Sequence, residues 1–180
     1  MKLILIRHLP TEFNRLGLLQ GRRDEPIALP SADVLSQIRE NRKILDTMPP
    51  FDAVIVSSLR RTAMTAKHYG FADPILDSLL DELDFGPFEG RPRADLMAED
   101  GKAWLENPYQ SLLCEFVRDL ESRVRQFVAI YSVRNTVLGF AHGSWIRALL
   151  SVLRHGNVAD MNRFDVPNNS LTVLEVMSGN

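Results

Sequence analysis

Three short apolar segments, each followed at once by polar residues, constrain the fold of this chain more than any other feature of its sequence. They occupy residues 2–6, 53–56 and 136–141, and they lead into the turns Arg-His, Ser-Ser-Leu-Arg-Arg and His-Gly. Apolar runs of four to six residues, rich in Val and Ile and bounded by turn signals, are typical of strands buried on both faces of a sheet. The sequence therefore predicts three interior strands that all end at polar turns.

Amphipathic helices are predicted between these strands. Ser31 and Asp33 are suitable caps for a helix that presents Val34, Ile38 and Leu45 on one face. The apolar residues of a second, more strongly amphipathic helix recur at spacings of four and three: Phe116, Leu120, Val124, Phe127, Val128 and Tyr131. The segment SLTVLEV near the end of the chain alternates weakly and predicts a last strand.

The alternation of strands and helices predicts an α/β protein: a three-layer sandwich with a mainly parallel central sheet and helices on both faces. A chain of 180 residues is expected to form a single domain over residues 1–180. Residues 84–115 interrupt the alternation with Gly, Pro and acidic clusters around short helical pieces. We expect this segment to form a lid-like insertion over one end of the sheet.

Composition excludes several classes of partner. The formal net charge of -2 provides no electrostatic footprint for nucleic acid or an anionic membrane, so neither is expected to bind. Cys114 is the only cysteine, which excludes an intramolecular disulfide and the C-x-x-C patterns of zinc and redox sites. No apolar stretch is long enough for a signal-peptide core or a membrane span, so a cytoplasmic location is expected. The sequence sets no oligomeric state.

Cationic and imidazole side chains stand at all three strand ends. Arg7 and His8 follow the first strand, Arg60 and Arg61 follow the second, and His142 follows the third. Ligands of such sheets bind beyond the carboxyl ends of the strands, so we expect these groups to face one crevice. Each has an ordinary structural explanation by itself, such as an ion pair or a packed histidine. Together, two guanidinium groups and two imidazoles suit a phosphoryl group, because Arg presents a planar fork of donors.

Two histidines at one site also raise the question of a metal. His8 and His142 lie far apart in sequence, without the H-x-x-x-H or H-E-x-x-H spacing of metal ligands. Two neighbouring arginines would repel a divalent cation. Neither a metal nor a cofactor is therefore expected.

Phosphoryl transfer at this crevice needs a nucleophile and a proton donor. A neutral imidazole can attack phosphorus and form a phosphohistidine, which water then hydrolyses, and nearby cations stabilise the phosphoryl oxygens. The leaving alkoxide needs a proton from an acid. Carboxyl groups suited to this role cluster in the segment LLDELDFGPFEG, at Asp81, Glu82, Asp84 and Glu89. The residues alone leave the choice among these four open.

The order of these groups resembles that of the histidine phosphatase superfamily, in its phosphoglycerate-mutase-like branch. RHLPTEFN stands where the family has R-H-G-x-T-x-x-N, and SSLRRTAMTA is similar to S-x-L-x-R-A-x-x-T-A. LDELDFGPFEG is similar to L-x-E-x-x-x-G-x-x-E-G, and FAHGSWIRALL contains the family's H-G-x-x-I-R. PNNSLTVLEV resembles the closing P-N-x-S strand. The matches occur in the family's order and span residues 2–176.

The resemblance implies a role for each residue that it matches. It selects Arg61 over Arg60 as the active-site arginine, and Glu82 among the four carboxyl groups as the proton donor. His8 would be the phosphorylated nucleophile. The phosphate-binding residues would be Arg7, Arg61, His142 and Asn14, and the substrate-binding residues at the mouth of the site would be Gln20 and Gly21.

Three departures from the family pattern bear on substrate preference, although none removes a catalytic group. Leu9 stands where the family has Gly, and a left-handed backbone conformation there would be costly for Leu. The residues CEF replace the family's G-E-S, which keeps Glu115 but loses the hydroxyl group. The helix around residues 30–45 lacks the usual Gly and Gln-Ala.

The resemblance implies a metal-independent phosphomonoesterase that hydrolyses a small phosphorylated metabolite through a phosphohistidine. The short insertion is most like that of small bacterial phosphatases, which include enzymes acting on alpha-ribazole phosphate, so this ester is one candidate substrate. Phosphoglycerate mutase-type phosphotransfer is an alternative, but a mutase must shield its phosphohistidine from water, which a small lid does poorly. A non-catalytic phosphate-binding adaptor on the same fold is the other alternative. Candidate pocket-lining residues of the insertion are Trp104, Tyr109, Phe88 and Arg93.

Overall fold

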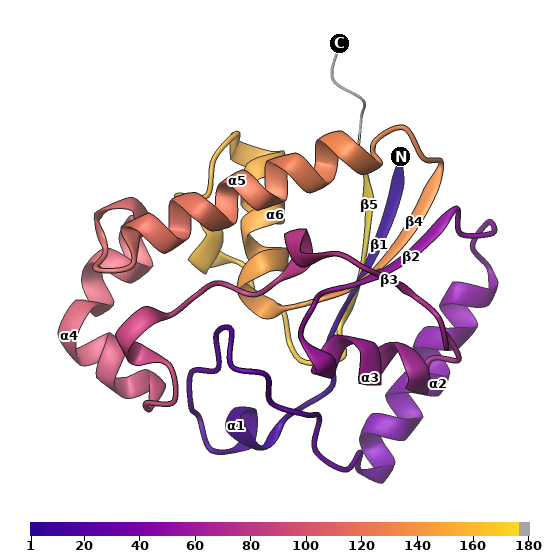
Figure 1. The fold of residues 1–180 in the computed structure, drawn as a ribbon, viewed down its shortest axis with the longest axis horizontal. Coiled ribbons are helices and arrows are strands. Elements are labelled where there is room, and N and C mark those ends of the chain that lie inside the picture. Colours follow the sequence, from indigo (N-terminus) through magenta and orange to yellow (C-terminus); the bar gives the residue numbers. More distant parts are fainter. Residues whose placement is uncertain (177–180) are drawn as a thin grey trace.

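The computed structural model describes residues 1–176, which fold around a five-stranded sheet with the strand order β3-β2-β4-β1-β5 (Figure 1). The strands are β1 (Lys2–Arg7), β2 (Ala53–Val56), β3 (Ile75–Leu76), β4 (Thr136–Ala141) and β5 (Leu171–Glu175). Only β5 runs antiparallel to its neighbour, β1. The predicted α/β fold with a mainly parallel sheet is confirmed.

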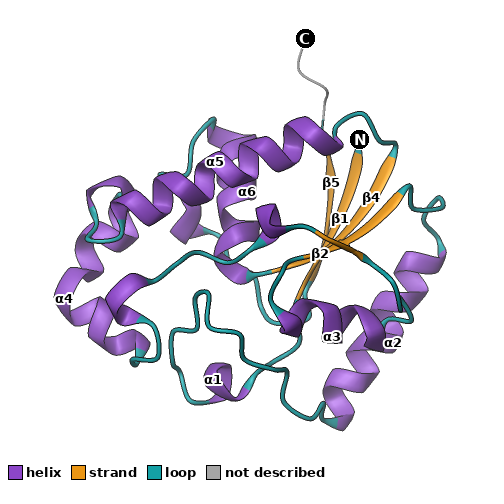
Figure 2. Cartoon of the chain, in the orientation of Figure 1, coloured by secondary structure: helices purple, strands orange, loops and turns teal. Residues whose placement is uncertain are grey.

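The helices cover both faces of this sheet (Figure 2). They are α1 (Glu12–Arg15), α2 (Ala32–Asp46), α3 (Arg60–His68), α4 (Arg93–Glu106), α5 (Cys114–Tyr131) and α6 (Gly143–His155). Single turns of 3₁₀ helix occur at Ser78–Leu80, Gly86–Phe88, Pro108–Gln110 and Met161–Arg163. No helix within residues 1–176 is both long enough and apolar enough to span a bilayer.

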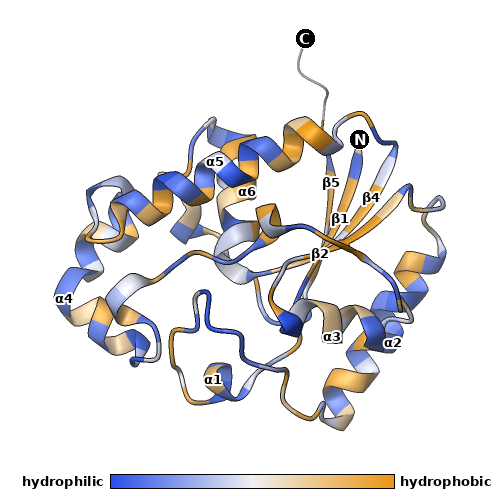
Figure 3. Ribbon diagram, in the orientation of Figure 1, coloured by the Kyte–Doolittle hydropathy of each residue, from blue (hydrophilic) through white to orange (hydrophobic). Residues whose placement is uncertain are grey.

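Alternating side chains of β1 divide the core into two layers. Leu3 and Leu5 pack with buried residues of α5 and α6, whereas Ile4 and Ile6 pack with buried residues of α2 and α3. All four are fully buried, as expected for a strand whose side chains point alternately to two covered faces. Figure 3 shows the resulting contrast between the largely hydrophobic central strands and the two-sided α2 and α5.

The parallel strands bring their polar ends to one edge. β1 pairs with β4 in a register that sets Arg7 opposite Ala141, and the backbone N–H of His8 continues the ladder by donating to the carbonyl of Ala141 at 2.9 Å. β2 pairs with the other side of β4. The starts of α3 and α6 therefore lie at the same edge as His8.

Residues 84–115 form the 3₁₀ turn at Gly86–Phe88, the helix α4 and the 3₁₀ turn at Pro108–Gln110. α4 lies beside this edge of the sheet, apart from the two layers that cover the faces (Figure 1). That the chain is one domain with this segment as a lid stays a prediction, and the last four residues of the predicted range 1–180 lie outside the described residues.

Leu9 is accommodated without strain. Asn169, with φ at 61°, is the one non-glycine residue of the described chain with a positive φ, so Leu9 does not adopt the left-handed conformation that would have been costly. Its side chain is fully buried in the core layer that contains Ile4 and Ile6. Its N–H donates to Thr65 Oγ1 at 3.0 Å. Leu9 is therefore a core residue that joins the first loop to α3.

We expect Leu9→Ala to lower the free energy of unfolding by about 3 kcal/mol, because it removes buried methyl groups and leaves a cavity. Urea unfolding measures this loss. Leu29→Ala is the matched control: Leu29 is 89% exposed, so its truncation should change stability by less than about 0.5 kcal/mol. Equal effects of the two substitutions would contradict the placement of Leu9.

Candidate active site

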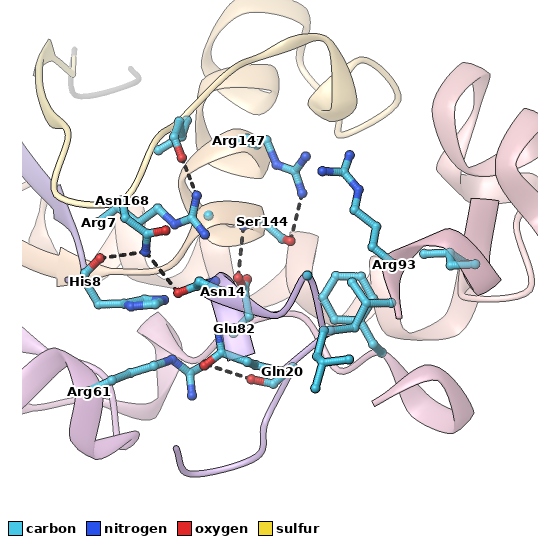
Figure 4. Close-up of a pocket in the computed structure, with 18 of the residues that line it drawn as sticks. Arg7, His8, Asn14, Gln20, Arg61, Glu82, Arg93, Ser144, Arg147 and Asn168 are labelled. Carbon is cyan, nitrogen blue, oxygen red and sulfur yellow. Dashed lines mark hydrogen bonds between the residues drawn. The ribbon is translucent and has the colours of Figure 1, made fainter. Parts of the chain in front are cut away.

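A cavity of about 320 Å³ opens at the carboxyl edge of the sheet. Seven of the eight predicted site residues line it: Arg7, His8, Asn14, Gln20, Gly21, Arg61 and Glu82. They come from the end of β1, from α1 and the first loop after it, from the start of α3 and from the segment that precedes α4. Figure 4 shows several of them converging on one space. The remaining residue, His142, does not line the cavity.

His8 is held as a neutral imidazole with one free nitrogen. Its Nδ1 lies 2.7 Å from the carbonyl oxygen of Leu9. A carbonyl can only accept, so Nδ1 carries the proton and Nε2 keeps a lone pair. Burial is the main cause that lowers the pKa of His8 well below its usual value, and the charges of Arg61 and Arg7 lower it further. A neutral imidazole with an available Nε2 is the form that can act as a nucleophile.

Arg7 is a half-buried cation and Arg61 a buried one, and both have donors to spare. Arg7 Nη1 donates to the carbonyl of Val166 at 2.6 Å, while its Nε is buried without a partner within residues 1–176. The guanidinium lies so close to Gly143 that a Cβ there would come within 3.2 Å of Cζ. Glycine at the first position of α6 therefore makes room for Arg7.

Arg61 is fully buried. Its Nη1 and Nη2 donate to the carbonyls of Arg23 and Gly21 at 2.7 and 2.8 Å, and its Nε donates to His142 Nδ1 at 3.1 Å. These bonds use three of its five N–H groups, so one N–H on each Nη remains for an oxyanion. Arg60, by contrast, is exposed and pairs with Asp24. The structure thus sets Arg61, and not Arg60, beside His8.

His142 lies behind the cavity wall, and the implied contact with the phosphoryl group stays a prediction. It is fully buried behind His8, with 5.2 Å between the ring centroids. Its Nδ1 accepts from Arg61, so Nε2 carries the proton that it donates to Ser57 Oγ at 2.7 Å. Both ring nitrogens are thus engaged by protein groups. Burial and the charge of Arg61 lower its pKa well below the usual value, which keeps this ring neutral.

Glu82 lies at the start of α6, on the wall of the cavity. Its Oε2 accepts from the N–H of Ser144 at 3.1 Å, and its Oε1 accepts from the N–H groups of Trp145 and Leu83 at 3.1 and 2.9 Å. Asp81, another candidate for the acid, is bonded to Ser58 through its carboxylate and does not line the cavity. The structure therefore favours Glu82 among the candidates by position.

The first loop supplies amide groups and a tight turn. Asn14 Oδ1 accepts from the N–H of Thr11, and Gln20 has a buried Oε1 without a partner in the described chain. Gly21 has a φ of +53°, and a Cβ there would come within 1.8 Å of Glu89 Oε1. Only glycine fits this turn, which presents its carbonyl to Arg61.

Sequence reasoning missed several residues at the cavity, among them Asn168, Ser144 and Arg147. Asn168 Nδ2 donates to the carbonyl of His8 at 2.9 Å and lies 3.3 Å from Asn14 Oδ1. Ser144 and Arg147 enter from α6. Their signals were present in the segments PNNS and HGSWIR, but neither segment states which side chains face the ligand.

The candidates from residues 84–115 divide evenly. Trp104 and Arg93 line the cavity. Phe88 is buried elsewhere under Arg91, and Tyr109 bonds to Glu121 on α5, so neither reaches the cavity. Within residues 1–176, no three His, Cys, Asp or Glu side chains gather in an arrangement that could hold a metal ion.

The site combines a neutral histidine, two arginines and a carboxyl group, which defines a site for phosphoryl transfer. Comparison with known proteins places it in a family. The model of the histidine phosphatase superfamily (branch 1) matches residues 3–180, and the chain belongs to that superfamily.

Relatives cover the chain almost completely. A putative phosphoserine phosphatase from Hydrogenobacter thermophilus is 26% identical over 97% of this chain and 89% of its own length. Among solved structures, the product of the open reading frame Rv3214 of Mycobacterium tuberculosis is 27% identical, with a TM-score of 0.81, and the match covers 99% of this chain and 92% of that one. The alpha-ribazole phosphatase of Shigella flexneri is 25% identical with a TM-score of 0.75, covering 98% and 91%. The protein is therefore a phosphatase of this superfamily, while its named relatives differ in substrate.

The two buried histidines predict a pH-dependent stability. Burial lowers the pKa values of His8 and His142 in the folded protein, whereas both titrate near 6.5 in the unfolded chain. Below that pH the unfolded chain binds protons that the folded protein does not, so the free energy of unfolding falls as the pH falls. Each histidine contributes up to about 1.4 kcal/mol per pH unit. Urea unfolding at pH 7.5, 6.5 and 5.5 should show this decline, and His8→Gln should make it shallower. An unchanged slope in the variant would be inconsistent with a neutral His8.

Proposed function

We propose that the protein hydrolyses a small phosphomonoester through a phosphohistidine on His8 Nε2. The observation that carries this proposal is the bond from His8 Nδ1 to the carbonyl of Leu9, because it fixes the tautomer whose lone pair faces the cavity. The membership in a phosphatase superfamily supports the same reaction class.

In the first step, the lone pair of His8 Nε2 attacks phosphorus while the bond from phosphorus to the ester oxygen breaks. Glu82, in its protonated form, gives its proton to the leaving oxygen. In the second step, water attacks the phosphohistidine and gives a proton to the Glu82 carboxylate. The P–N bond breaks, and inorganic phosphate and the free His8 are released. At the end of the cycle Glu82 is protonated again, and the lone pair is back on His8 Nε2.

Arg7 and Arg61 stabilise the negative phosphoryl oxygens during both steps, since each keeps N–H groups that no protein acceptor uses. Asn14 adds an amide at the entrance, and Gln20 and Gly21 form the near wall. His142 acts through its bond to Arg61, which fixes the guanidinium beside His8. We assign it a positioning role in place of direct phosphate contact.

Hydrolysis is favoured over the non-catalytic adaptor because the nucleophile and the acid both line one cavity with the two arginines. A binding module would need the cations alone. Among phosphotransfer reactions, hydrolysis is the simpler assignment, because it needs no second phosphate position for an acceptor. Alpha-ribazole phosphate and phosphoserine both stand as candidates from the names of the relatives.

The test is hydrolysis of 4-nitrophenyl phosphate near pH 6 in EDTA by wild type and His8→Ala. We expect wild type to be active in EDTA and His8→Ala to lose about 10³-fold or more in kcat/KM. Intact-protein mass spectrometry after a rapid quench should detect one phosphoryl group on wild type alone. The matched control is His68→Ala, an exposed imidazole at the end of α3, which should keep wild-type activity. Full activity of His8→Ala would refute the proposal.

Glu82→Gln separates acid catalysis from a structural role. The leaving 4-nitrophenolate needs little protonation, whereas an alkoxide needs a full proton. We therefore expect kcat for an alkyl phosphate to fall by about 10²-fold or more, and kcat for 4-nitrophenyl phosphate to fall much less. Equal losses for both esters would assign Glu82 to holding the start of α6 instead.

A further inference from the structure

Arg147 is a half-buried cation that the proposed reaction does not use. It lies one turn into α6, where its Nη2 donates to Ser144 Oγ at 3.0 Å. Its Nε is closed off from solvent and has no hydrogen-bond partner within residues 1–176. The side chain lines the cavity, at the end away from His8 and Arg61 (Figure 4). Four of its five N–H groups are thus left without a protein acceptor.

The charge of Arg147 is not balanced by an ion pair. Across the described chain, no carboxylate lies within 4 Å of the charged groups of Arg147, Arg93 or Arg7. Burial is the main cause that lowers the pKa of Arg147 to about 10, and the positive charges of Arg7 and Arg93 also lower it. The carboxyl groups of Glu82 and the exposed Asp165 raise it in part. Figure 4 shows the guanidinium groups of Arg147 and Arg93 directed toward each other. Two facing cations are stabilised by an anion placed between them.

The walls around this end of the cavity strengthen such an interaction. Phe85, Leu96 and Trp104 are buried apolar residues that line it. Apolar walls lower the local dielectric, so a charge-assisted bond from a guanidinium is stronger there than at the surface. Leu96 and Trp104 belong to α4, which begins at Arg93. One element therefore supplies both a cation and part of the apolar wall.

We propose that Arg147, with Arg93 and the hydroxyl group of Ser144, binds a carboxylate of the substrate while Arg7 and Arg61 bind its phosphoryl group. The substrate class is then a short phosphomonoester of a carboxylic acid. This inference rests on the proposed function, because it takes the phosphoryl group to lie at His8.

A carboxylate fits this end of the cavity better than a second phosphate or a neutral ring. Arg147 and Arg93 carry two positive charges. With Glu82 protonated, as the proposed first step requires, Asp165 nearby offsets one of these charges. A monoanion matches the remaining charge, whereas a phosphate dianion exceeds it. Alpha-ribazole phosphate carries no second anionic group, so it would leave Arg147 without an acceptor, which costs binding free energy. The cavity volume of about 320 Å³ also suits a small substrate.

The test compares 3-phosphoglycerate with glycerol 3-phosphate, which has a hydroxymethyl group in place of the carboxylate. We expect wild type to favour 3-phosphoglycerate by about tenfold or more in kcat/KM, mainly through KM. Arg147→Gln should bring the ratio of the two kcat/KM values near one, and Arg147→Lys, which keeps the charge, should retain part of it. Arg93→Gln, at an exposed position, should reduce the ratio by a smaller factor. Arg39→Gln removes the same charge from the exposed face of α2 and should leave the ratio unchanged.

Other outcomes would overturn the assignment. Equal kcat/KM values of wild type for the two esters, or an equal loss for both in Arg147→Gln, would contradict the carboxylate site. A preference for propane-1,3-diol bisphosphate over 3-phosphoglycerate would assign this end of the cavity to a second phosphate. Calorimetric affinities of His8→Ala for both esters provide a readout that does not need turnover, so the site can be refuted separately from the reaction. Activity on 4-nitrophenyl phosphate without any preference for the carboxylate would leave the phosphatase proposal standing and remove this one.

Discussion

The parallel pairing of β1 with β4 is the constraint on which the site depends. Its register sets the end of β1 beside the end of β4, and the ladder continues one residue further through the N–H of His8. Because β2 flanks the other side of β4, the start of α3 reaches the same edge. A shift of one residue in this register would turn Leu3 and Leu5 into the opposite core layer. The apolar layers that stabilise the sheet therefore also fix the place of the nucleophile.

Gathering cations at this edge carries an electrostatic cost that the surrounding groups offset. Arg61 is fully buried and Arg7 half-buried, and neither forms an ion pair within the described residues. Backbone carbonyls accept from both guanidinium groups, and Glu82 contributes a favourable charge nearby. Burial lowers the pKa values of His8 and His142, and the same arginines lower them further, so both rings stay neutral. The positive charge that would bind a phosphoryl group thus also helps to keep the nucleophile His8 neutral. The two arginines therefore contribute to both substrate binding and the reactivity of His8.

Much of the fold followed from the sequence, because the buried strands are continuous apolar runs with clear polar ends. The strand predicted at 136–141 and the one at 53–56 have the bounds found in the structure. Topology brings parallel strand ends together, so the meeting of Arg7 and His8 with the Arg60–Arg61 pair was predictable. The choice of Arg61 came from the family resemblance. The position of His142 behind the cavity was not predictable, since the sequence does not reveal that Ser57 and Arg61 bind its two ring nitrogens. Arg147 was missed because an arginine within an amphipathic helix gives no sign of whether it faces solvent or a cavity.

The attachment of the first loop to Arg61 has a consequence for how specificity can evolve. Arg61 holds this loop through the carbonyl oxygens of Gly21 and Arg23, which every amino acid provides. Apart from Gly17 and Gly21, whose positive φ angles favour glycine, the loop can exchange its side chains while its backbone stays anchored. Selection can therefore reshape the entrance of the cavity in small steps without disturbing the group that neutralises the phosphoryl charge. A fold built in this way can pass from one ester to another with its chemistry intact.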